Sequence, residues 1–372
     1  MNSSRQDPPK PDELEISVIG PGRGECVLVH LGDNDWCIVD SCTARTVNEP
    51  VAIGYLRSLN NNAQNRVKLV VATHWHDDHI RGLAKMLEAF PDAQFACSAA
   101  LNTDNFALLL EIAEESLQET SGVDEFRRIR DLLIERCKAA GIAKSLISPV
   151  LAIQNRCLLR LPAEGRSFPA AVISVSPSDG TVKKAFADIA DWLPKSGELQ
   201  RGIPNRAPNK TSVGLWVEAA SRRVLLGADL EHTEQPGEGW VAVIASHQDD
   251  RLAGIFKIPH HGSRNADCPD VWSKMLSKNP IGVVTPFTSG AGLPTEKDIR
   301  RLCGRTNTLF CTAQGPGAPP RRDSVVEKAA RYTTQKRHVL SGTPGHVRVR
   351  WSAKHEAAQP TVECFNGAYP IQ

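Results

Sequence analysis

Residues 73–80 read THWHDDHI, which places three histidines and two aspartates within six consecutive positions. They follow the apolar run VKLVVA (67–72), which has the character of a strand buried inside an α/β sheet. A helical pattern, HIRGLAKMLEAF (79–90), comes next. We therefore expect the histidines at the carboxyl end of a strand, where open α/β sheets bind their ligands.

The composition is that of an ordinary globular protein. The 372 residues are 41% hydrophobic and 23% charged, and a chain of this length can bury a sizeable core. The 44 basic and 42 acidic residues leave a formal net charge of +2. This balance gives no reason to expect nucleic acid or a membrane surface as a partner.

The cysteines and the N-terminus indicate a cytoplasmic location. The ten cysteines form no CxxC pair and no framework spacing, so we interpret them as reduced thiols. Residues 1–13 are rich in proline and polar residues, and we expect a disordered tail there. No run of about 18 apolar residues occurs, so no membrane partner is expected.

The pattern along residues 14–372 predicts one α/β domain with a helical insertion. Two apolar runs, CVLVHLG (26–32) and DWCIVDSC (35–42), predict a hairpin, and GPGRG (20–24) before them predicts a turn. The segment at about 102–146 has helical spacing of its apolar residues and predicts a helical hairpin. Further strands are expected near 170–179, 212–229, 252–263, 280–287 and 307–314, and helices near 49–60, 269–278, 294–303 and 323–335.

The residues of the cluster suit two divalent metal ions. His74 and His76 are two positions apart at a strand end, so both imidazoles can point to the same side. Asp78 and His79 follow after the chain has turned and offer a carboxylate and a nitrogen to a neighbouring ion. Such ligands suit zinc or manganese. Asp77 is expected to face solvent or a neighbour of the ligands.

The same residues resemble the H-x-H-x-D-H signature of the metallo-β-lactamase superfamily. This resemblance implies an αββα sandwich and a two-metal hydrolytic site. It also implies that Asp40 in IVDS is the acidic residue that ends an early strand, and that Asp229 in VLLGAD bridges the two metals. Either His260 or His261 in KIPHHGS (257–263) supplies the last metal-binding histidine.

Three further stretches resemble the hydrolase domain of the ComEC-type DNA-uptake proteins and their soluble relatives. They are VIGPGRGECVLV (18–29), NKTSVGLWV with RRVLLGADLE (209–217 and 222–231), and FKIPHHGS (256–263). The resemblance covers about residues 14–315, apart from the helical block, and implies nuclease or other phosphodiesterase activity. None of the transmembrane helices of those proteins is present, so no channel role is expected.

Two positions of the site depart from the superfamily pattern or stay open. No histidine occurs between 79 and 229, where the superfamily usually has another ligand, and Asn209 or Ser212 is a candidate to point toward the vacant position. In the superfamily the ligand usually lies two residues past such a proline, so the resemblance favours His261 as the ligand, with His260 beside it or against the substrate. Ser263 and Arg264 follow, and the arginine is either an anion clamp or a surface ion pair.

We therefore expect a metal-dependent hydrolase that uses a metal-bound hydroxide, with Asp78 as orienting group and possible base. The expected substrate is a phosphodiester, either nucleic acid or a small phosphoester. One alternative is hydrolysis of a non-phosphate ester, thioester, lactone or amide. Another is a toxin-like effector or regulatory module controlled by a partner protein, with the helical block as docking surface. A protein partner or a homo-oligomer stays possible on the sequence alone.

Overall fold

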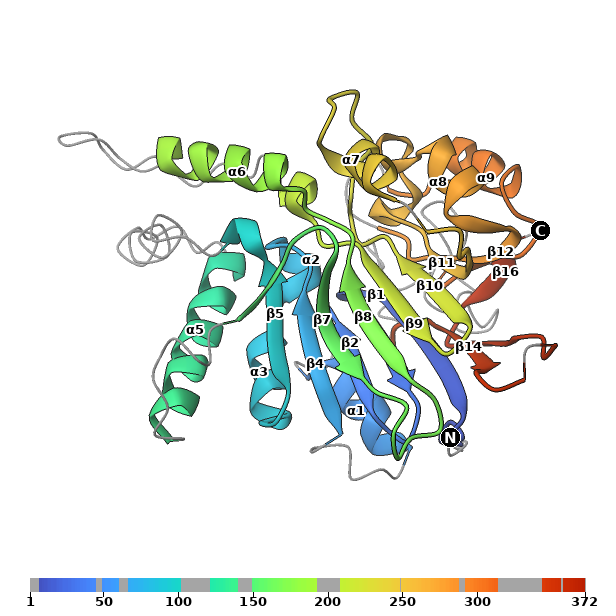
Figure 1. Ribbon diagram of the computed structural model, residues 1–372, viewed down its shortest axis with the longest axis horizontal. Coiled ribbons are helices and arrows are strands. Elements are labelled where there is room, and N and C mark those ends of the chain that lie inside the picture. Colours follow the sequence, from blue (N-terminus) through green and yellow to red (C-terminus); the bar gives the residue numbers. More distant parts are fainter. Residues whose placement is uncertain are drawn as a thin grey trace, which may run out of the picture.

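The computed structural model of the protein describes residues 7–44, 49–59, 66–101, 121–139, 149–192, 208–247, 249–287, 292–313, 343–355 and 357–371. These residues form two mixed sheets of eight strands each. Helices cover the outer face of each sheet (Figure 1).

The first sheet has the order β15-β14-β1-β2-β4-β5-β6, and β3 pairs with β1 outside this path. β1 and β2 form the predicted antiparallel hairpin, with Val27 opposite Val39, while β2, β4, β5 and β6 run parallel. The strands are β1 (Glu13–Leu31), β2 (Trp36–Val39), β3 (Cys42–Thr43), β4 (Val67–Ala72), β5 (Gln94–Ser98), β6 (Val150–Ala152), β14 (His346–Ser352) and β15 (Thr361–Phe365).

The second sheet has the order β16-β13-β12-β11-β10-β9-β8-β7. β9 and β10 form an antiparallel hairpin within 212–229, where strands were expected, and β10 to β13 run parallel, so their carboxyl ends lie on one edge. The strands are β7 (Arg156–Leu161), β8 (Ala170–Ser174), β9 (Leu215–Ala219), β10 (Arg222–Leu226), β11 (Ala253–Lys257), β12 (Leu276–Val284), β13 (Leu309–Cys311) and β16 (Tyr369–Ile371).

Three apolar clusters define four layers. One cluster lies between the sheets and joins Val27 and Val29 of β1 to Val217 and Ile255 of the second sheet. The others lie under the helices on the outer face of each sheet. The helices are α1 (Val51–Ser58), α2 (Asp77–Ile80), α3 (Leu83–Ala89), α5 (Ser121–Ala139), α6 (Asp179–Trp192), α7 (Gly239–Ser246), α8 (Pro269–Lys274) and α9 (Glu296–Cys303). Figure 1 shows the blue and cyan helices α1 and α3 apart from the yellow and orange α7, α8 and α9. The predicted αββα sandwich is confirmed.

Only part of the predicted helical insertion lies within the described residues. Residues 102–120 and 140–146 lie outside them, whereas α5 is a long helix whose Phe126, Ile129 and Leu133 are buried in the cluster under α1 and α3. Glu125 of α5 accepts a hydrogen bond of 2.8 Å from the Ala84 backbone N–H. The apolar face of α5 is therefore part of the core.

The turn predicted at GPGRG is wrong, because residues 20–24 lie inside the long strand β1. Gly24 has a φ of 113°, and a Cβ there would lie 2.2 Å from the Asp78 carbonyl oxygen. A residue with a side chain would clash with the chain that carries the histidines. The glycines therefore let β1 bend and pass directly against the cluster.

The ends of the chain hold elements that the sequence patterns did not predict. β14, β15 and β16 extend both sheets, and the helix expected at 323–335 lies outside the described residues. Residues 1–6 of the expected tail also lie outside them. Residues 7–13, in contrast, are held by the main chain: Asp33 N–H donates to the Pro11 carbonyl and Ala353 N–H to the Asp12 carbonyl.

The cysteine side chains and the character of the helices bear on two further expectations from the sequence. All ten cysteines are free thiols, and seven of them are buried. Within the described residues, no helix has both the length and the apolar character that spanning a bilayer requires.

Candidate metal centre

The histidine cluster lies where strands of both sheets end. His74 and His76 follow β4 of the first sheet, and Asp78 and His79 lie in the short helix α2 directly after them. Asp229 follows β10 of the second sheet, and His261 follows β11 in a 3₁₀ turn (His260–Gly262). The site is therefore built from both halves of the sandwich.

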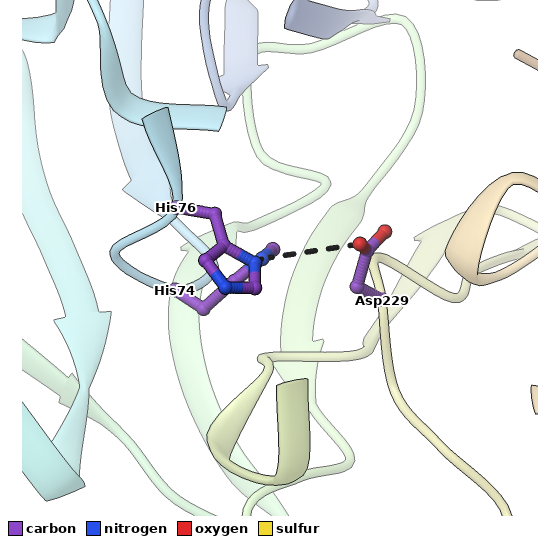
Figure 2. A group of neighbouring side chains, drawn as sticks. All are labelled: His74, His76 and Asp229. Atoms are coloured by element: carbon purple, nitrogen blue, oxygen red, sulfur yellow. Dashed lines mark hydrogen bonds and ion pairs between the residues drawn. The ribbon is translucent and has the colours of Figure 1, made fainter. Parts of the chain in front are cut away.

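His74, His76 and Asp229 form one group of possible metal ligands. One ligand atom of each lies within 4.8 Å of the others. Figure 2 shows Asp229 facing the two imidazoles across the gap, with His74 Nε2 3.9 Å from Asp229 Oδ2. His74 Nε2 also lies 3.1 Å from His76 Nδ1.

Asp78, His79 and His261 form a second group within the same limit of 4.8 Å. His261 Nε2 lies 3.5 Å from Asp78 Oδ2 and 3.8 Å from Asp229 Oδ2. His79 Nε2 lies 3.4 Å from Asp229 Oδ1. Asp229 thus lies between the two groups, in the place that a bridging ligand requires.

The Nδ1 atoms of three histidines are held by protein groups, which directs their Nε2 atoms to the cluster. His79 Nδ1 donates to Asp40 Oδ2 at 2.6 Å, and His261 Nδ1 donates to the Thr285 carbonyl oxygen at 3.0 Å. His74 Nδ1 contacts Thr73 Oγ1 at 3.0 Å, and that hydroxyl donates to Asp40 Oδ2 at 2.7 Å. Metal-binding histidines are fixed in this way because the second ring nitrogen sets the tautomer.

The cluster contains buried atoms that lack a protein partner. His79 Nε2 and Asp229 Oδ1 make no hydrogen bond with the described residues. Both side chains are buried, and leaving such atoms unpaired is costly. A divalent cation between the imidazole nitrogens and carboxylate oxygens would satisfy them, so the residues present fit the metal ions that the sequence predicted.

The backbone at the site is strained. Asp40, Ala228, His260 and His261 are non-glycine residues with φ between 45° and 59°. Such conformations persist only where the surrounding structure enforces them, and they gather at functional sites. At Asp40 the enforcement is visible, because its carboxylate accepts hydrogen bonds from the Thr73 backbone and from His79.

The pKa values of the cluster show how its histidines and carboxylates act on one another. Burial lowers the pKa of His74 well below its usual value, and the neighbouring His79 adds to this shift. Burial alone would raise the pKa of Asp229, but His79 and His261 outweigh it and hold the pKa well below its usual range. The carboxylates in turn raise the pKa of His79, against the effect of burial. The carboxylates thus favour positive charge among these side chains, and a divalent cation would supply it in place of the imidazole protons.

His260 and Asn209 lie beside the cluster in a separate polar group around Glu231. Asn209 Nδ2 donates to Glu231 Oε1 and to His260 Nε2, both at 3.2 Å. His260 Nδ1 lies 3.7 Å from Glu231 Oε1 and has no hydrogen-bond partner among the described residues. The structure therefore brings His261, and not His260, to the metal groups, and it directs the Asn209 amide N–H toward His260.

Ser263 and Arg264 lie farther along the same loop. Ser263 is half-buried, and its N–H donates to the His260 carbonyl at 2.9 Å. Arg264 is exposed. Asp77 is paired with Arg81 at 2.8 Å on the surface, away from the ligands.

Sequence reasoning missed Glu25 and Lys257, which form a buried ion pair at the cluster. Each is a charged residue within an apolar strand: GECVLV (24–29) and GIFKI (254–258). Because a charge is buried only with a partner, these two interruptions were a readable signal. Their separation by more than two hundred residues concealed that they are partners.

A comparison with solved structures gave matches of low sequence identity. SMB-1, a metallo-β-lactamase in complex with mercaptoacetic acid, is 16% identical over 73% of this chain and 84% of its own, with a TM-score of 0.35. MEM-A1, a subclass B3 metallo-β-lactamase from a soil metagenome, is 14% identical over 72% and 83%, with a TM-score of 0.34.

Zinc-bound PqqB from Methylobacterium extorquens is 15% identical over 62% of this chain and 58% of its own, with a TM-score of 0.28. TM-scores of this size are too low for details of the sites to be compared. A search among curated proteins gave no significant match.

The family model decides the assignment. It matches residues 19–267, which is more than half of the chain and includes every residue of the two metal groups. The two sheets, the helical outer layers and the joint site at their strand ends agree with it. The chain belongs to the metallo-β-lactamase superfamily, a family of metal-dependent hydrolases.

Proposed function

We propose that this protein is a metal-dependent phosphodiesterase that acts on nucleic acid or on a small phosphoester. The observation that carries the proposal is the position of Asp229 between two groups of ligands, His74 with His76 and Asp78 with His79 and His261. Two adjacent cation sites match the requirement of in-line displacement at phosphorus, where charge develops on the entering and leaving oxygens.

The two groups would hold one divalent ion each, zinc or manganese, with Asp229 shared. Ions held by these residues would supply a lowered pKa to a coordinated water and would stabilise negative charge on the phosphate oxygens. The chain itself contributes the placement of the ligands. Asp40 and Thr285 hold the rings of His79 and His261, so the ligands need little rearrangement before a cation binds.

Asp78 is the side chain best placed to act on water. Its side chain is 28% exposed, whereas those of His79 and Asp229 are 0% and 3% exposed. Burial alone would raise its pKa, but His79 and His261 lower it below the usual range, so the carboxylate is ionised near neutral pH. An ionised, solvent-reaching carboxylate at the site can orient a water molecule by accepting a hydrogen bond from it, while its lowered pKa makes it a weak proton acceptor.

The phosphodiester part of the proposal is supported by the sequence resemblance to ComEC-type hydrolase domains. The residues that carry it, GPGRGE, NKTS and KIPHHGS, all lie at or next to the cluster: Glu25 belongs to a group with His79 and Asp229, Asn209 contacts His260, and His261 is a candidate ligand. The alternative, cleavage of a thioester, lactone or amide, would use the same cations. Assays with each class of substrate distinguish the two activities.

The test is a set of cleavage assays with manganese- or zinc-loaded protein. The substrates are single- and double-stranded DNA, RNA, bis-p-nitrophenyl phosphate, a thioester and a lactone. We expect cleavage of at least one phosphodiester, and loss of it in Asp78→Asn. The matched control is Asp77→Asn, because Asp77 is the adjacent residue but pairs with Arg81 on the surface. This control is expected to retain full activity.

Cleavage of the thioester or lactone without cleavage of any phosphodiester would replace the proposed substrate class and keep the hydrolase. Cleavage that is equal in Asp78→Asn and wild-type protein would contradict the role given to Asp78.

A further inference from the structure

Glu25 and Lys257 are two charged residues that lie between the two sheets, next to the metal centre. Glu25 lies on the same face of β1 as Val27 and Val29, which pack between the sheets, because side chains alternate along a strand. Lys257 lies on the same face of β11 as Ile255, for the same reason. Both charged side chains are almost fully buried, at 2% and 1% exposure.

The pair is tied to the metal centre by contacts on both sides. Lys257 Nζ pairs with Glu25 Oε1, and it also donates to the carbonyl oxygen of Ala228 at 3.2 Å. Ala228 directly precedes Asp229. An oxygen of Glu25 also lies within 4.8 Å of ligand atoms of His79 and Asp229.

One oxygen of this carboxylate has no partner. Glu25 Oε2 is buried and makes no hydrogen bond with the described residues, while Oε1 is taken by Lys257. Burying a charge is costly unless its hydrogen-bonding capacity is satisfied, and a pair that leaves one oxygen unsatisfied loses much of its benefit. His79 Nε2 and Asp229 Oδ1 are in the same condition, and both residues form with Glu25 a group whose ligand atoms lie within 4.8 Å of one another.

The backbone is arranged to bring Glu25 there. Gly24 passes so close to the Asp78 and Ser41 carbonyl oxygens that a Cβ would lie 2.2 Å and 2.6 Å from them. Glu25, the residue after it, therefore lies close to the loop that carries the histidines. A glycine and a carboxylate at adjacent positions together give the chain access to the cations.

We propose that Glu25 is a further ligand of the metal centre on the side of His79, with Lys257 holding its other oxygen. This inference rests on the metal centre of the proposed function. It adds a carboxylate on the side of the site that Asp78, His79 and His261 form. Lys257 fixes the orientation of the Glu25 carboxylate. It also offsets part of the negative charge that Glu25 adds to that of Asp78 and Asp229.

A purely electrostatic role for Glu25 makes a different prediction. If Glu25 only neutralised Lys257, removal of both charges would leave metal binding intact. If Glu25 is a ligand, removal of both charges would leave the metal with one oxygen fewer. The comparison of Glu25→Gln with the double variant Glu25→Gln/Lys257→Met therefore separates the two roles.

The experiment measures metal affinity of the chelator-treated protein by competition between Mn²⁺ or Zn²⁺ and a chromophoric chelator, without any substrate. We expect Glu25→Gln and the double variant to bind one ion about a hundredfold or more weaker than wild type, since changes even one contact removed from a metal cost 10–100-fold. Lys257→Met alone keeps the ligand and is expected to bind both ions.

The matched control is Glu15→Gln. Glu15 is a buried glutamate of the same strand, paired with Arg350 at 2.8 Å, and is not a member of any of the metal groups. Its replacement removes a buried ion pair and is expected to lower stability without changing metal affinity. Circular dichroism of each metal-free variant shows whether it is folded, and Glu25→Asp, which retains the charge, serves if the glutamine variant does not fold.

Wild-type affinity in Glu25→Gln, or recovery of it in the double variant, overturns the inference. Glu25→Asp is expected to bind more weakly than wild type, because its shorter side chain withdraws the oxygen, and equal binding would count against the proposal. Absence of metal binding by wild-type protein would instead contradict the proposed function, so the two failures are distinguishable.

Discussion

Asp40 shows how one residue organises the site without belonging to either group of ligands. Its carboxylate accepts hydrogen bonds from the Thr73 backbone N–H at 2.8 Å, from the Thr73 hydroxyl at 2.7 Å and from His79 Nδ1 at 2.6 Å. It does so from a backbone with φ of 59°, which costs energy that these bonds offset. Asp40 therefore fixes His79 directly and His74 through Thr73.

Replacing Asp40 tests this role. Asp40→Asn keeps the size of the side chain but removes the charge that fixes the His79 ring, so we expect metal affinity to fall about 10–100-fold. Asp35→Asn is the matched control, because Asp35 is also buried and pairs with Arg166 and Arg66 at the far end of β2. Titration calorimetry with Zn²⁺ checks this expectation, and equal affinities in the two variants would refute it.

His346 makes stability depend on pH. Burial lowers its pKa to about 3, and Arg348 and Arg350 add to this shift. The unfolded chain has a histidine pKa of about 6.5, so it binds the proton first. The contribution to stability is therefore complete above about pH 6.5 and is lost as the pH falls toward 3.

We expect this one group to remove about 2 kcal/mol of unfolding free energy between pH 7 and pH 5. His346→Gln lacks the titrating ring but can still donate to Ser17, which His346 Nε2 contacts at 2.9 Å. Urea unfolding of both proteins at the two pH values measures the difference. The same pH dependence in both would show that His346 does not titrate in this way.

At the residue scale, the sequence predicted much of the cluster because its spacing carries the information. Four of the six predicted ligands occur within six positions, and the structure brings all six into the two groups. The choice between His260 and His261 was open, because the local backbone conformation decides which of two neighbouring side chains points toward the other ligands. Asn209 was expected near a vacant ligand position. Its amide N–H donates to Glu231 and His260, and its Oδ1 is buried without a hydrogen-bond partner among the described residues.

At the element scale, β1 matters most for the site, and the sequence predicted it only in part. A glycine-rich stretch usually marks a turn, so GPGRG was expected to end a strand. In the structure the paired strand continues through it, with β3 opposite Arg23 and Gly24. The glycines are needed for close approach to Asp78, which no local pattern could reveal because Asp78 is distant in sequence.

Gly24→Ala tests the need for this close approach. We expect a loss of at least about 2 kcal/mol of stability, from a strained backbone and from a methyl group with no room. Gly54→Ala is the matched control, because Gly54 lies inside α1 with nothing within 4 Å of an added Cβ. There alanine is expected to stabilise by about 0.5–1 kcal/mol. Chemical denaturation measures both, and a neutral Gly24→Ala would contradict the account of β1.

The long parallel and hairpin strands were predictable because their apolar patterns are strong, as in VKLVVA for β4 and RRVLL for β10. β7 and β15 were not, because they are edge strands with mixed exposure, and a half-exposed strand lacks a continuous apolar run. The core position of α5 could not be predicted either. Its helical pattern does not show what covers its apolar face.

At the scale of the whole molecule, the metal centre joins the two sheets. His74, His76, Asp78 and His79 follow β4 of the first sheet, while Asp229 and His261 follow β10 and β11 of the second. A cation bound between them therefore contacts both halves of the sandwich, and the Glu25–Lys257 pair links β1 to β11 below it. Metal binding and folding stability are expected to be coupled.

This coupling predicts that chelation lowers stability. An ion present at about a hundred times its Kd stabilises the folded state by about 2.7 kcal/mol, since the unfolded chain lacks the assembled site. We expect a higher melting temperature with Zn²⁺ or Mn²⁺ than with chelator, and a much smaller shift in Asp229→Asn. Differential scanning calorimetry measures both, and equal shifts in the two proteins would place the metal elsewhere.

The most direct test of the two-metal site is the metal content of the reconstituted protein after removal of free ions. The account predicts two zinc or manganese ions per chain, and fewer in Asp229→Ala, because Asp229 lies between both groups of ligands. Mass spectrometric metal analysis, combined with circular dichroism to show that the variant is folded, gives the count. A wild-type protein without bound metal, or an Asp229→Ala protein that keeps both ions, would contradict it.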